Sequence, residues 1–430
     1  MNVLLLGGGG REHAIAWKLR QSSLLTNLHV APGNAGTAQI AHNLPLTIPA
    51  TATEPAEWRY LNEKVKEIAK AVKADLIIPS QEDLLANGLT DYLTEFGFAV
   101  FGPTRAAAKI EASKIFSHEF MGRWKIPTPE GWPYERYIEA VHLVNQAIFP
   151  LVLKADGLAA GKGVQILHDL YDALESVKSY MLNGKFGEAG KKVLLQRFYK
   201  GREVSLAAFT DGYDAIHLPT ACDYKTFHEG GANTGGVGAY SPAAWLDTDL
   251  VGKMNFEIAA KAIFGLADEG KPFRGVLYPG VMVGDEGPKV LEFNCRLGDP
   301  ETQALLPRMQ GDLLAVMLAC VSGERKLLQV PVSWDQRPTV CIVLCSEGYP
   351  GPLKKINVPI TGLENVPEDV LVFHAGTKLQ DGRVVTNGGR VLSIVCSGTT
   401  LDQARNKAYA AVEKIHFDGM VYRENIGLLN

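Results

Sequence analysis

The sequence predicts an α/β protein with an open parallel sheet at the N-terminus and a small α+β domain at the C-terminus. In the first hundred or so residues, short apolar runs alternate with helical patterns, which is typical of βαβ units. From Thr339 onward, strands separated by turns dominate, and one long helix follows them. The chain has 430 residues, enough for roughly two to four domains.

The first expected element is a buried strand over residues 2–6, followed by four glycines and a helix over residues 14–21. A glycine turn between a strand and a helix presents backbone N–H groups at a helix N-terminus, where phosphate binds. Glu12 stands where a dinucleotide-binding motif has its third glycine, and no acidic residue closes the next strand. The pattern therefore favours a smaller phosphorylated ligand over NAD. The alternative is a tight turn without a ligand.

The N-terminal sheet is expected to continue up to Gly102-Pro103, which marks a boundary. Open parallel sheets bind their ligands beyond the carboxyl ends of the strands, so we expect Gly8, Asn34 and Glu82 to lie on one rim. The further elements of this domain are helices over residues 58–73 and 84–96 and strands over residues 75–79 and 99–101.

The middle of the chain is organised around residues 152–164, where a strand ending at Lys154 runs into a loop of glycine and alanine. Small side chains let backbone N–H groups approach an anion closely, and Lys154 and Lys162 supply positive charge. We interpret this segment as a flap over a polyphosphate. The alternative is a surface hairpin with two solvated lysines. The spacing is not that of a P-loop.

Periodicity and turn residues predict the remaining elements. Asp211-Gly212 indicates a hairpin turn, and the polar, glycine-rich loop over residues 223–241 is long enough to suggest a function. We expect helices over residues 106–124, 137–146, 172–182, 255–269, from after 302 to about 322, and 401–415, and strands over residues 192–198, 203–210, 217–221, 275–283, 289–293, 339–345, 370–375, 383–386 and 390–396.

The composition excludes several classes of function. A net charge of −4 gives no general attraction to nucleic acid or anionic membranes, and no apolar run is long enough to span a bilayer. The N-terminus enters a strand at once, so no signal peptide is visible. The six scattered cysteines fit reduced, buried thiols better than a metal site. We expect a cytoplasmic monomer that acts on small molecules.

Glu292 and Asn294 alternate on a predicted strand, so their side chains point to the same face. Carboxylate and amide oxygens on one face suit Mg²⁺ held between the protein and nucleotide phosphates. Arg296 follows two residues later and is suited to neutralise a transferring phosphate or to clamp a carboxylate. For Glu292 alone, the alternative is a strand-end carboxylate in a salt bridge.

Short motifs along essentially the whole chain occur in a characteristic order. They are Gly-Arg-Glu-His (10–13), Ala-Pro-Gly-Asn-Ala-Gly-Thr (31–37), Lys-Ala-Asp-Gly-Leu-Ala-Ala-Gly-Lys-Gly-Val (154–164), Asn-Thr-Gly-Gly-Val-Gly-Ala-Tyr-Ser-Pro (233–242), Glu-Phe-Asn-Cys-Arg-Leu-Gly-Asp-Pro-Glu-Thr-Gln (292–303), Phe-His-Ala-Gly-Thr (373–377) and Thr-Asn-Gly-Gly-Arg-Val-Leu (386–392). The set resembles the ATP-grasp ligases and, among them, the glycinamide ribonucleotide synthetase (phosphoribosylamine–glycine ligase) family. The flap motif alone is shared by many ATP-grasp enzymes, whereas the ordered set is specific.

The resemblance implies a fold and a reaction. It implies a Rossmann-like substrate domain over residues 1–102, an ATP-grasp domain over residues 103–326 with a flap subdomain at about 124–192, and a C-terminal α+β domain over residues 327–430. The implied reaction uses ATP and Mg²⁺ or Mn²⁺ to convert glycine to glycyl phosphate. The amine of 5-phosphoribosylamine then attacks, which yields glycinamide ribonucleotide, ADP and phosphate in purine biosynthesis.

The resemblance also implies a role for individual residues. The nucleotide would meet Lys114, Lys154, Gly161, Lys162, Gln196, Phe198 and Glu203, and the metal would meet Glu292 and Asn294. Arg296, Asp299 and Lys154 would be catalytic. The amine substrate would be bound by Gly8, Gly9, Asn34, Glu82, Asp223, Lys225, Gly388, Gly389 and Arg390.

Three segments depart from the family pattern. Residues 80–82 read Ser-Gln-Glu where Gly-Pro-Glu is usual, residues 223–226 read Asp-Tyr-Lys-Thr instead of Asp-His-Lys-Arg, and the hinge begins with Gln196 instead of Glu. Gln196 retains an acceptor for an adenine amino group. The first two departures leave a different amine or amino acid open as an alternative substrate. A nucleotide-binding module without catalysis is disfavoured because Lys154, Glu292, Asn294 and Arg296 are all present.

Overall fold

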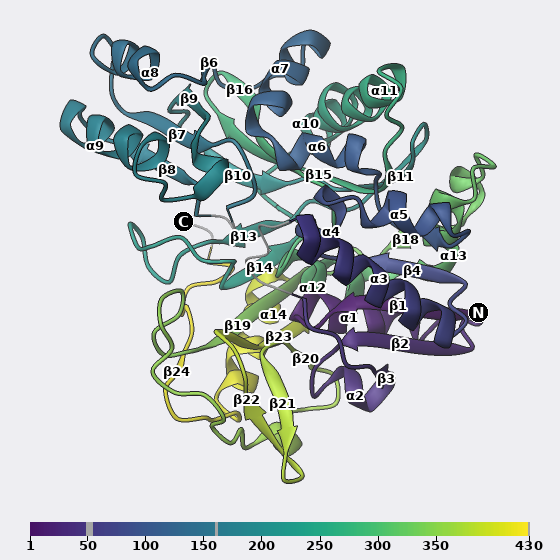
Figure 1. Cartoon of the computed structure of the whole chain (residues 1–430). Helices are drawn as coiled ribbons and strands as arrows, with labels where there is room; N and C mark the ends of the chain where they lie inside the picture. The colour runs from purple at the N-terminus through teal and green to yellow at the C-terminus, as the bar shows by residue number, and fades with distance from the viewer. Residues whose placement is uncertain (49–54, 160–161, 429–430) are drawn as a thin grey trace.

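The computed structural model describes residues 1–48, 55–159 and 162–428. In Figure 1 the N-terminal sheet lies on the right, a small sheet with two helices projects at the upper left, and the C-terminal strands lie at the bottom. Within the described residues, no helix has the length and apolar character needed to cross a membrane.

The N-terminal domain is a parallel sheet with the strand order β3-β2-β1-β4-β5, as predicted. The predicted helix over residues 84–96 is wrong as a single element, because Gly88 adopts a left-handed φ of 81° and separates two short helices. The elements are β1 (Asn2–Gly7), α1 (Gly10–Leu19), β2 (Asn27–Pro32), α2 (Thr37–Ile40), β3 (His42–Asn43), α3 (Pro55–Ala71), β4 (Leu76–Pro79), α4 (Glu82–Ala86), α5 (Leu89–Glu95) and β5 (Ala99–Val100).

The flap subdomain is an antiparallel sheet with the order β6-β9-β7-β8. Lys154 pairs with Val164 across the β7–β8 hairpin, so the glycine-rich loop between them projects from the end of this sheet. The elements are β6 (Gly131–Tyr134), α8 (Tyr137–Val144), β7 (Leu151–Ala155), β8 (Val164–Leu167), α9 (Leu170–Met181), a 3-10 turn (Gly187–Gly190) and β9 (Val193–Arg197).

The larger lobe beside the flap is an antiparallel sheet in which β15 is the central strand. Its order is β10-β15-β11-β12, and β16 also pairs with β15. The predicted hairpin turn at Asp211-Gly212 joins β11 to β12. The elements are α6 (Arg105–Ala112), α7 (Lys114–Trp124), β10 (Arg202–Ser205), β11 (Ala208–Asp211), β12 (Ala215–His217), α10 (Thr248–Met254), a π-helical turn (Asn255–Ala260), α11 (Lys261–Asp268), β15 (Arg274–Gly284) and β16 (Gly287–Asn294).

Two predicted elements of this lobe are interrupted. The predicted helix over residues 106–124 breaks at Ser113, which is extended and whose hydroxyl caps α7 by accepting from the Phe116 N–H at 3.0 Å. The predicted strand over residues 203–210 is divided into β10 and β11, although both pair with β15 in one register. The interruption faces Pro279, which has no N–H to give to the ladder.

The C-terminal sheet has the order β13-β14-β19-β23-β20, with β24 also on β19. The polar loop over residues 223–241 begins and ends in this sheet, because β13 and β14 flank it. The elements are β13 (Cys222–Tyr224), β14 (Gly238–Ser241), α12 (Glu301–Leu305), a 3-10 turn (Leu306–Arg308), β17 (Met309–Gln310), α13 (Leu313–Val321), a 3-10 turn (Leu327–Gln329), β18 (Ser333–Trp334), β19 (Thr339–Ser346), a 3-10 turn (Leu363–Asn365), β20 (Leu371–His374), β21 (Thr377–Gln380), β22 (Arg383–Thr386), β23 (Arg390–Ser397), α14 (Leu401–Val412) and β24 (Met420–Val421).

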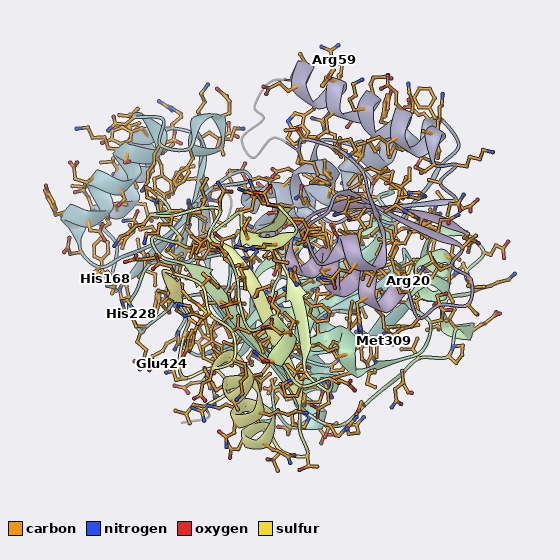
Figure 2. The ribbon with its side chains drawn as sticks, turned by 90° about the horizontal axis from the view of Figure 1, so that it is seen from below. Arg20, Arg59, His168, His228, Met309 and Glu424 are labelled. Atoms are coloured by element: carbon orange, nitrogen blue, oxygen red, sulfur yellow. The ribbon has the colours of Figure 1, made fainter. Side chains whose placement is uncertain are left out.

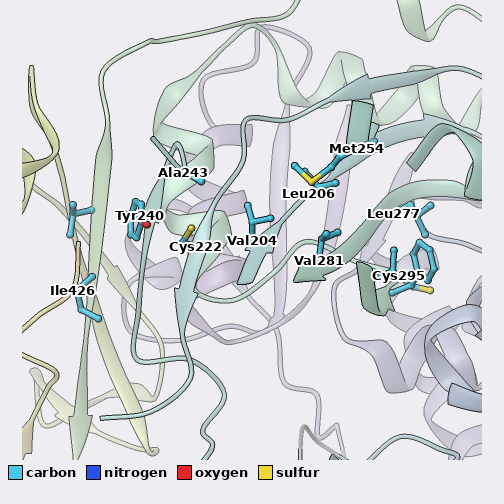
Figure 3. Close-up of a cluster of buried hydrophobic side chains, with 14 of the residues drawn as sticks. Val204, Leu206, Cys222, Tyr240, Ala243, Met254, Leu277, Val281, Cys295 and Ile426 are labelled. Atoms are coloured by element: carbon cyan, nitrogen blue, oxygen red, sulfur yellow. The ribbon is translucent and has the colours of Figure 1, made fainter. Parts of the chain in front are cut away.

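A continuous apolar core joins the larger lobe to the C-terminal domain. Figure 3 shows Leu206, Met254 and Leu277 at one side of this cluster and Tyr240 and Ile426 at the other. All six cysteines are free and buried, which confirms the predicted burial of the thiols. The shared sheet and core fix the polar loop relative to both domains, whereas the domain boundaries stay a prediction.

Two buried histidines join the N-terminal helix α1 to the C-terminal strand β20. His13 accepts a hydrogen bond through Nδ1 from the backbone N–H of His374 at 2.8 Å, and the two rings lie 5.7 Å apart. Burial lowers the pKa of His13 to about 3, with a further contribution from His374, and burial lowers the pKa of His374 to about 4. Both rings are therefore neutral at physiological pH.

We predict that this contact makes stability depend on pH. The folded-state pKa of His13 lies below its usual value, so its contribution is complete above about pH 6.5 and falls as the pH drops toward 3. The expected loss is about 1.4 kcal/mol per pH unit. His13→Asn keeps a hydrogen-bond acceptor but does not titrate, so urea unfolding between pH 6.5 and 4.5 should have a shallower pH slope. Equal slopes for both proteins would contradict the assignment.

Candidate active site

A cavity of about 120 Å³ lies between the flap loop and the end of strand β16. We call it the central cavity. It brings together segments that are far apart in the sequence, namely the starts of α4 and α7, the β7–β8 loop and the segment after β16. Its lining residues are Glu82, Glu111, Lys114, Ala155, Gly157, Leu158, Ala159, Gly163, Val164, Glu292, Asn294 and Arg296.

Lys154 lies on β7 and connects the flap to the larger lobe. Its side chain is buried, and Nζ donates a hydrogen bond to the backbone oxygen of Leu291 on β16 at 2.8 Å. Burial lowers the pKa of Lys154 to about 8, and the carboxylate of Glu292 opposes that shift. Lys162, also predicted for the nucleotide, is exposed, whereas Gly161 lies outside the described residues.

Lys114 and Glu292 form an ion pair of 3.1 Å at the cavity. Because the chain breaks at Ser113, Lys114 is the first residue of α7. The pKa of Glu292 is depressed mainly by Lys114, against the effect of burial, with further contributions from Lys225 and Lys154. Burial lowers the pKa of Lys114, but its carboxylate neighbours more than offset this, so its pKa lies above the usual value. Glu292 is therefore a carboxylate surrounded by cations.

Asn294 follows Glu292 by two residues on β16, so both project to the same face. Its side-chain nitrogen lies 3.5 Å from the backbone oxygen of Tyr278, and its oxygen has no hydrogen-bond partner in the described part of the chain. The described part of the chain contains no cluster of three or more His, Cys, Asp or Glu side chains that could hold a metal. A cation here would therefore need oxygens from a bound ligand.

Arg296 connects the larger lobe to the N-terminal domain. Its guanidinium lies 3.1 Å from Glu82 at the start of α4 and 3.6 Å from Glu111 on α6. Arg296 lowers the pKa of Glu82 to about 2 against the opposing effect of burial. Sequence reasoning does not single out Glu111; its position three residues before Lys114 is the only signal. Arg296 and Glu82, assigned to different substrates by the resemblance, thus contact each other.

The hinge residues lie where β9 leaves the flap and β10 enters the larger lobe. Gln196 is buried, and its amide nitrogen lies 3.3 Å from Nδ1 of His118 and 3.4 Å from the backbone oxygen of Pro129. Phe198 is half-buried. Glu203 accepts a hydrogen bond from Lys225, which follows β13. Lys225, predicted for the amine substrate, therefore contacts Glu203, which is predicted for the nucleotide.

Asn34 joins the glycine turn of the N-terminal domain to the C-terminal domain. Its amide nitrogen donates to the backbone oxygens of Gly8 at 3.0 Å, Gly9 at 3.4 Å and His374 at 2.7 Å. Its amide oxygen accepts from the backbone N–H of Gly36 at 2.8 Å. The Asn34 side chain therefore fixes the rim on which Gly8 and Gly9 lie.

Arg390 of the C-terminal domain pairs with Asp299, which follows the Arg296 segment. Their side chains are 2.9 Å apart, and Arg390 also donates to the backbone oxygens of Asp299 at 2.8 Å and Gly235 at 2.6 Å. Gly389 lies so close to Tyr349 that an added Cβ would be 2.3 Å from the ring. Gly388 similarly approaches the backbone of Gly376. A side chain at position 389 would therefore displace the Tyr349 ring, and one at position 388 would be tight against the Gly376 backbone.

Comparison with known proteins finds relatives over nearly the whole chain. The models for phosphoribosylglycinamide synthetase match residues 1–111 (N domain), 112–302 (ATP-grasp (A) domain) and 339–429 (C domain). A phosphoribosylamine–glycine ligase of Caldanaerobacter subterraneus subsp. tengcongensis is 41% identical over 428 residues, which cover 99% of each chain.

Solved structures show the same relationship. The phosphoribosylamine–glycine ligase of Thermotoga maritima has a TM-score of 0.83 at 33% identity, over 99% of this chain and 100% of that one. A biotin carboxylase–β,γ-ATP complex from Campylobacter jejuni has a TM-score of 0.77 at 13% identity, over 99% and 94% of the two chains, a likeness of fold alone. The chain therefore belongs to the phosphoribosylglycinamide synthetase family and has the ATP-grasp fold.

Proposed function

We propose that this chain ligates glycine to 5-phosphoribosylamine at the expense of ATP, giving glycinamide ribonucleotide, ADP and phosphate in purine biosynthesis. The observation that carries the proposal is the central cavity, where Lys114, beside the buried Lys154, faces the ionised Glu292 beneath a flap loop. Such a cavity suits a triphosphate and a divalent cation. Relatives that match the full length carry the same ligase name.

The proposed chemistry proceeds in two steps. A free carboxylate is a poor acyl donor because its leaving group would be oxide. An oxygen of glycine attacks the γ-phosphorus of ATP, and ADP leaves with the electrons of the broken P–O bond. The amine nitrogen then bonds to the carbonyl carbon of glycyl phosphate, and phosphate leaves. Most of the work of the protein is to neutralise charge and align the reactants.

The nucleotide is held between the flap and the larger lobe in this proposal. Lys114 and Lys154 neutralise phosphate oxygens, and the exposed Lys162 adds charge from the flap. Backbone groups near Gln196 and Phe198 meet adenine, and Glu203 takes the ribose hydroxyls. Lys225, which pairs with Glu203, lies close enough to Glu292 to lower the pKa of that carboxyl, which supports one continuous nucleotide site.

Glu292 and Asn294 would hold Mg²⁺ or Mn²⁺. The fit rests on two features of these residues: neighbouring lysines keep Glu292 ionised, and the Asn294 oxygen has no hydrogen-bond partner in the described part of the chain. Mg²⁺ in nucleotide sites commonly uses one or two protein carboxylates and takes its other ligands from phosphates and water. The bound cation would supply charge neutralisation at the phosphates.

The acceptor substrates are proposed to lie between the three domains. Arg296 and Asp299 serve glycine and its acyl phosphate, because Arg296 lines the central cavity and Asp299 follows it on the same segment. The pairing of Asp299 with Arg390 supports a site shared with the C-terminal domain. The residues proposed for phosphoribosylamine are Gly8, Gly9, Asn34, Glu82, Asp223, Lys225, Gly388, Gly389 and Arg390.

The proposal also covers the location, the oligomeric state and the partners of the enzyme. The buried free thiols support a cytoplasmic location, and the net charge of −4 supports small-molecule substrates with neither nucleic acid nor a membrane as partner; a monomer is part of the same proposal.

The direct test is turnover of the purified chain with ATP, glycine and 5-phosphoribosylamine. ADP release should require both glycine and the amino-sugar, and mass spectrometry should identify glycinamide ribonucleotide. ADP release that proceeds with another amine or amino acid, and not with this pair, would replace the proposal with a related carboxylate–amine ligase.

We predict that ATP binding takes up a proton at Lys154 above pH 8. Burial lowers the pKa of this lysine to about 8, and a bound triphosphate favours its charged form. The affinity for ATP should therefore fall as the pH rises through 8, and calorimetry in buffers of different ionisation enthalpy should detect the proton.

Lys154→Met should abolish this proton uptake and raise the KM for ATP about tenfold or more, because an interaction with a charged group is lost. Lys178→Met, an exposed lysine on α9 of the same subdomain, is the matched control. Normal turnover and unchanged proton uptake in Lys154→Met would remove Lys154 from the nucleotide site.

We predict that Glu292→Gln raises the Mg²⁺ concentration needed for half-maximal activity by about tenfold or more. The change keeps the size of the side chain but removes a charged oxygen ligand. The measurement is a Mg²⁺ titration at fixed ATP. Glu286→Gln, at the exposed turn between β15 and β16, controls for loss of one negative charge. An unchanged titration curve would exclude Glu292 as a metal ligand.

A further inference from the structure

Amide formation requires a group that accepts a proton, and this inference rests on the function proposed above. When the amine attacks glycyl phosphate, its nitrogen carries one proton too many. Most carboxylates around the site already face a partner in the structure. The engaged groups are Glu82 and Glu111 with Arg296, Glu292 with Lys114, Glu203 with Lys225, Asp299 with Arg390 and Glu301 with Tyr278.

Asp223 differs from these carboxylates. Its side chain is half-buried and, within the described residues, it forms no ion pair and accepts no hydrogen bond other than one from its own backbone N–H. It lies on β13, directly opposite Ala239 of β14. Lys225 follows two residues later on the extended chain, so both side chains project to one side. Since Lys225 pairs with Glu203, the Asp223 carboxyl lies on the side of β13 that faces the nucleotide residues.

On its other side, Asp223 lies near the segment after β16 that is proposed to hold the acyl phosphate. After β13 the chain returns through Gly236, where an added Cβ would be 3.1 Å from the backbone oxygen of Asp299. Glu301, two residues after Asp299, is close enough to influence the ionisation of Asp223. Asp223 therefore lies between the cationic nucleotide residues and the segment that carries Arg296 and Asp299.

The charged groups around Asp223 set its ionisation. Burial raises the pKa of Asp223 to about 8; Lys225 opposes this rise, while Glu301 on α12 and Glu203 on β10 add to it. On β15, the Tyr278 hydroxyl is occupied by Glu301 and Ser205. A carboxyl that titrates near the working pH is suited to exchange protons with a substrate.

We propose that the Asp223 carboxylate accepts the proton that the amine of 5-phosphoribosylamine releases as it is acylated. The N–C bond forms at the carbonyl carbon of glycyl phosphate, and the C–O bond to phosphate breaks with its electrons leaving on phosphate. The N–H proton moves to the Asp223 carboxylate and then to solvent. Asp223 takes no part in the phosphorylation of glycine.

The test separates the two steps in Asp223→Asn. With ATP, glycine and phosphoribosylamine all present, rapid quenching should show that ADP still forms in a burst of about one equivalent per active site. Amide formation should fall about 100-fold or more. The glycyl phosphate that accumulates is trapped by quenching into hydroxylamine as the glycine hydroxamate. The wild-type enzyme should accumulate little of it.

The pH profile supplies an independent readout. Wild-type amide formation should decline as the pH falls below about 8, because Asp223 must be ionised to accept a proton. The residual activity of Asp223→Asn should lack this decline. Glu229→Gln is the matched control, since Glu229 is exposed on the same loop and lines an outer pocket with Glu424. In Figure 2 the neighbouring His228 lies at the edge of the molecule, on the same side as Glu424.

Each outcome bears on a different statement. Equal losses of the ADP burst and of amide formation would show that Asp223 acts structurally, and an undiminished amide rate would show that no proton passes to it; both overturn the inference. A wild-type enzyme that forms ADP with this substrate pair but never glycyl phosphate or its amide would instead overturn the proposed function.

Discussion

The ionised carboxylate of Glu292 is the constraint on which the central cavity depends. Lys114 opens α7, Lys154 lies on β7 and Lys225 follows β13, and all three influence this one carboxylate. Like charges that converge in a partly buried space repel one another, and Glu292 offsets them in the unliganded chain. Within the described residues Lys154 forms no ion pair and donates only to a backbone oxygen, so its charge is available to a polyphosphate; its burial costs stability without a ligand and supplies affinity with one.

Two further ion pairs relate this cavity to the other domains. Arg296 faces Glu82 of the N-terminal domain, and Asp299 faces Arg390 of the C-terminal domain. Arg296 and Asp299 are only three residues apart, so the short segment after β16 contacts both domains. Removing one partner of such a pair leaves a partly buried charge without compensation, which costs more than the pair itself contributes. The relative positions of the three domains are therefore coupled to the segment that is proposed to hold the acyl phosphate.

The sequence predicts the N-terminal sheet well because each strand and helix has its own hydrophobic period. It predicts less well where a single residue interrupts a periodic run. Ser113 stands within an otherwise helical pattern, and its role as an N-cap becomes clear only once the chain turns there. The sequence at 203–210 reads as one continuous strand. Pro279 on β15 interrupts the hydrogen-bond ladder opposite it, and nothing in the local sequence at 203–210 indicates this interruption.

The candidate site likewise has some features that a local sequence pattern predicts and others that it does not. The same-face placement of Glu292 and Asn294 follows from a strand period of two, and the structure has it. Asn34 contacts His374, 340 positions away, and Glu111 contacts Arg296, 185 positions away. No local pattern predicts contacts between residues so far apart in the sequence. Asn34 in particular stands in a motif that predicts ligand binding, and the structure adds a second role, because its amide holds the glycine turn.

The central claim is that the triphosphate lies among the lysines that surround Glu292, and a crystal structure with a non-hydrolysable ATP analogue and Mg²⁺ tests it most directly. The account predicts phosphate oxygens within hydrogen-bond distance of Lys114 and Lys154 and the cation on Glu292 and Asn294. A nucleotide bound at full occupancy with its phosphates outside the space between Lys154 and Glu292 would contradict it.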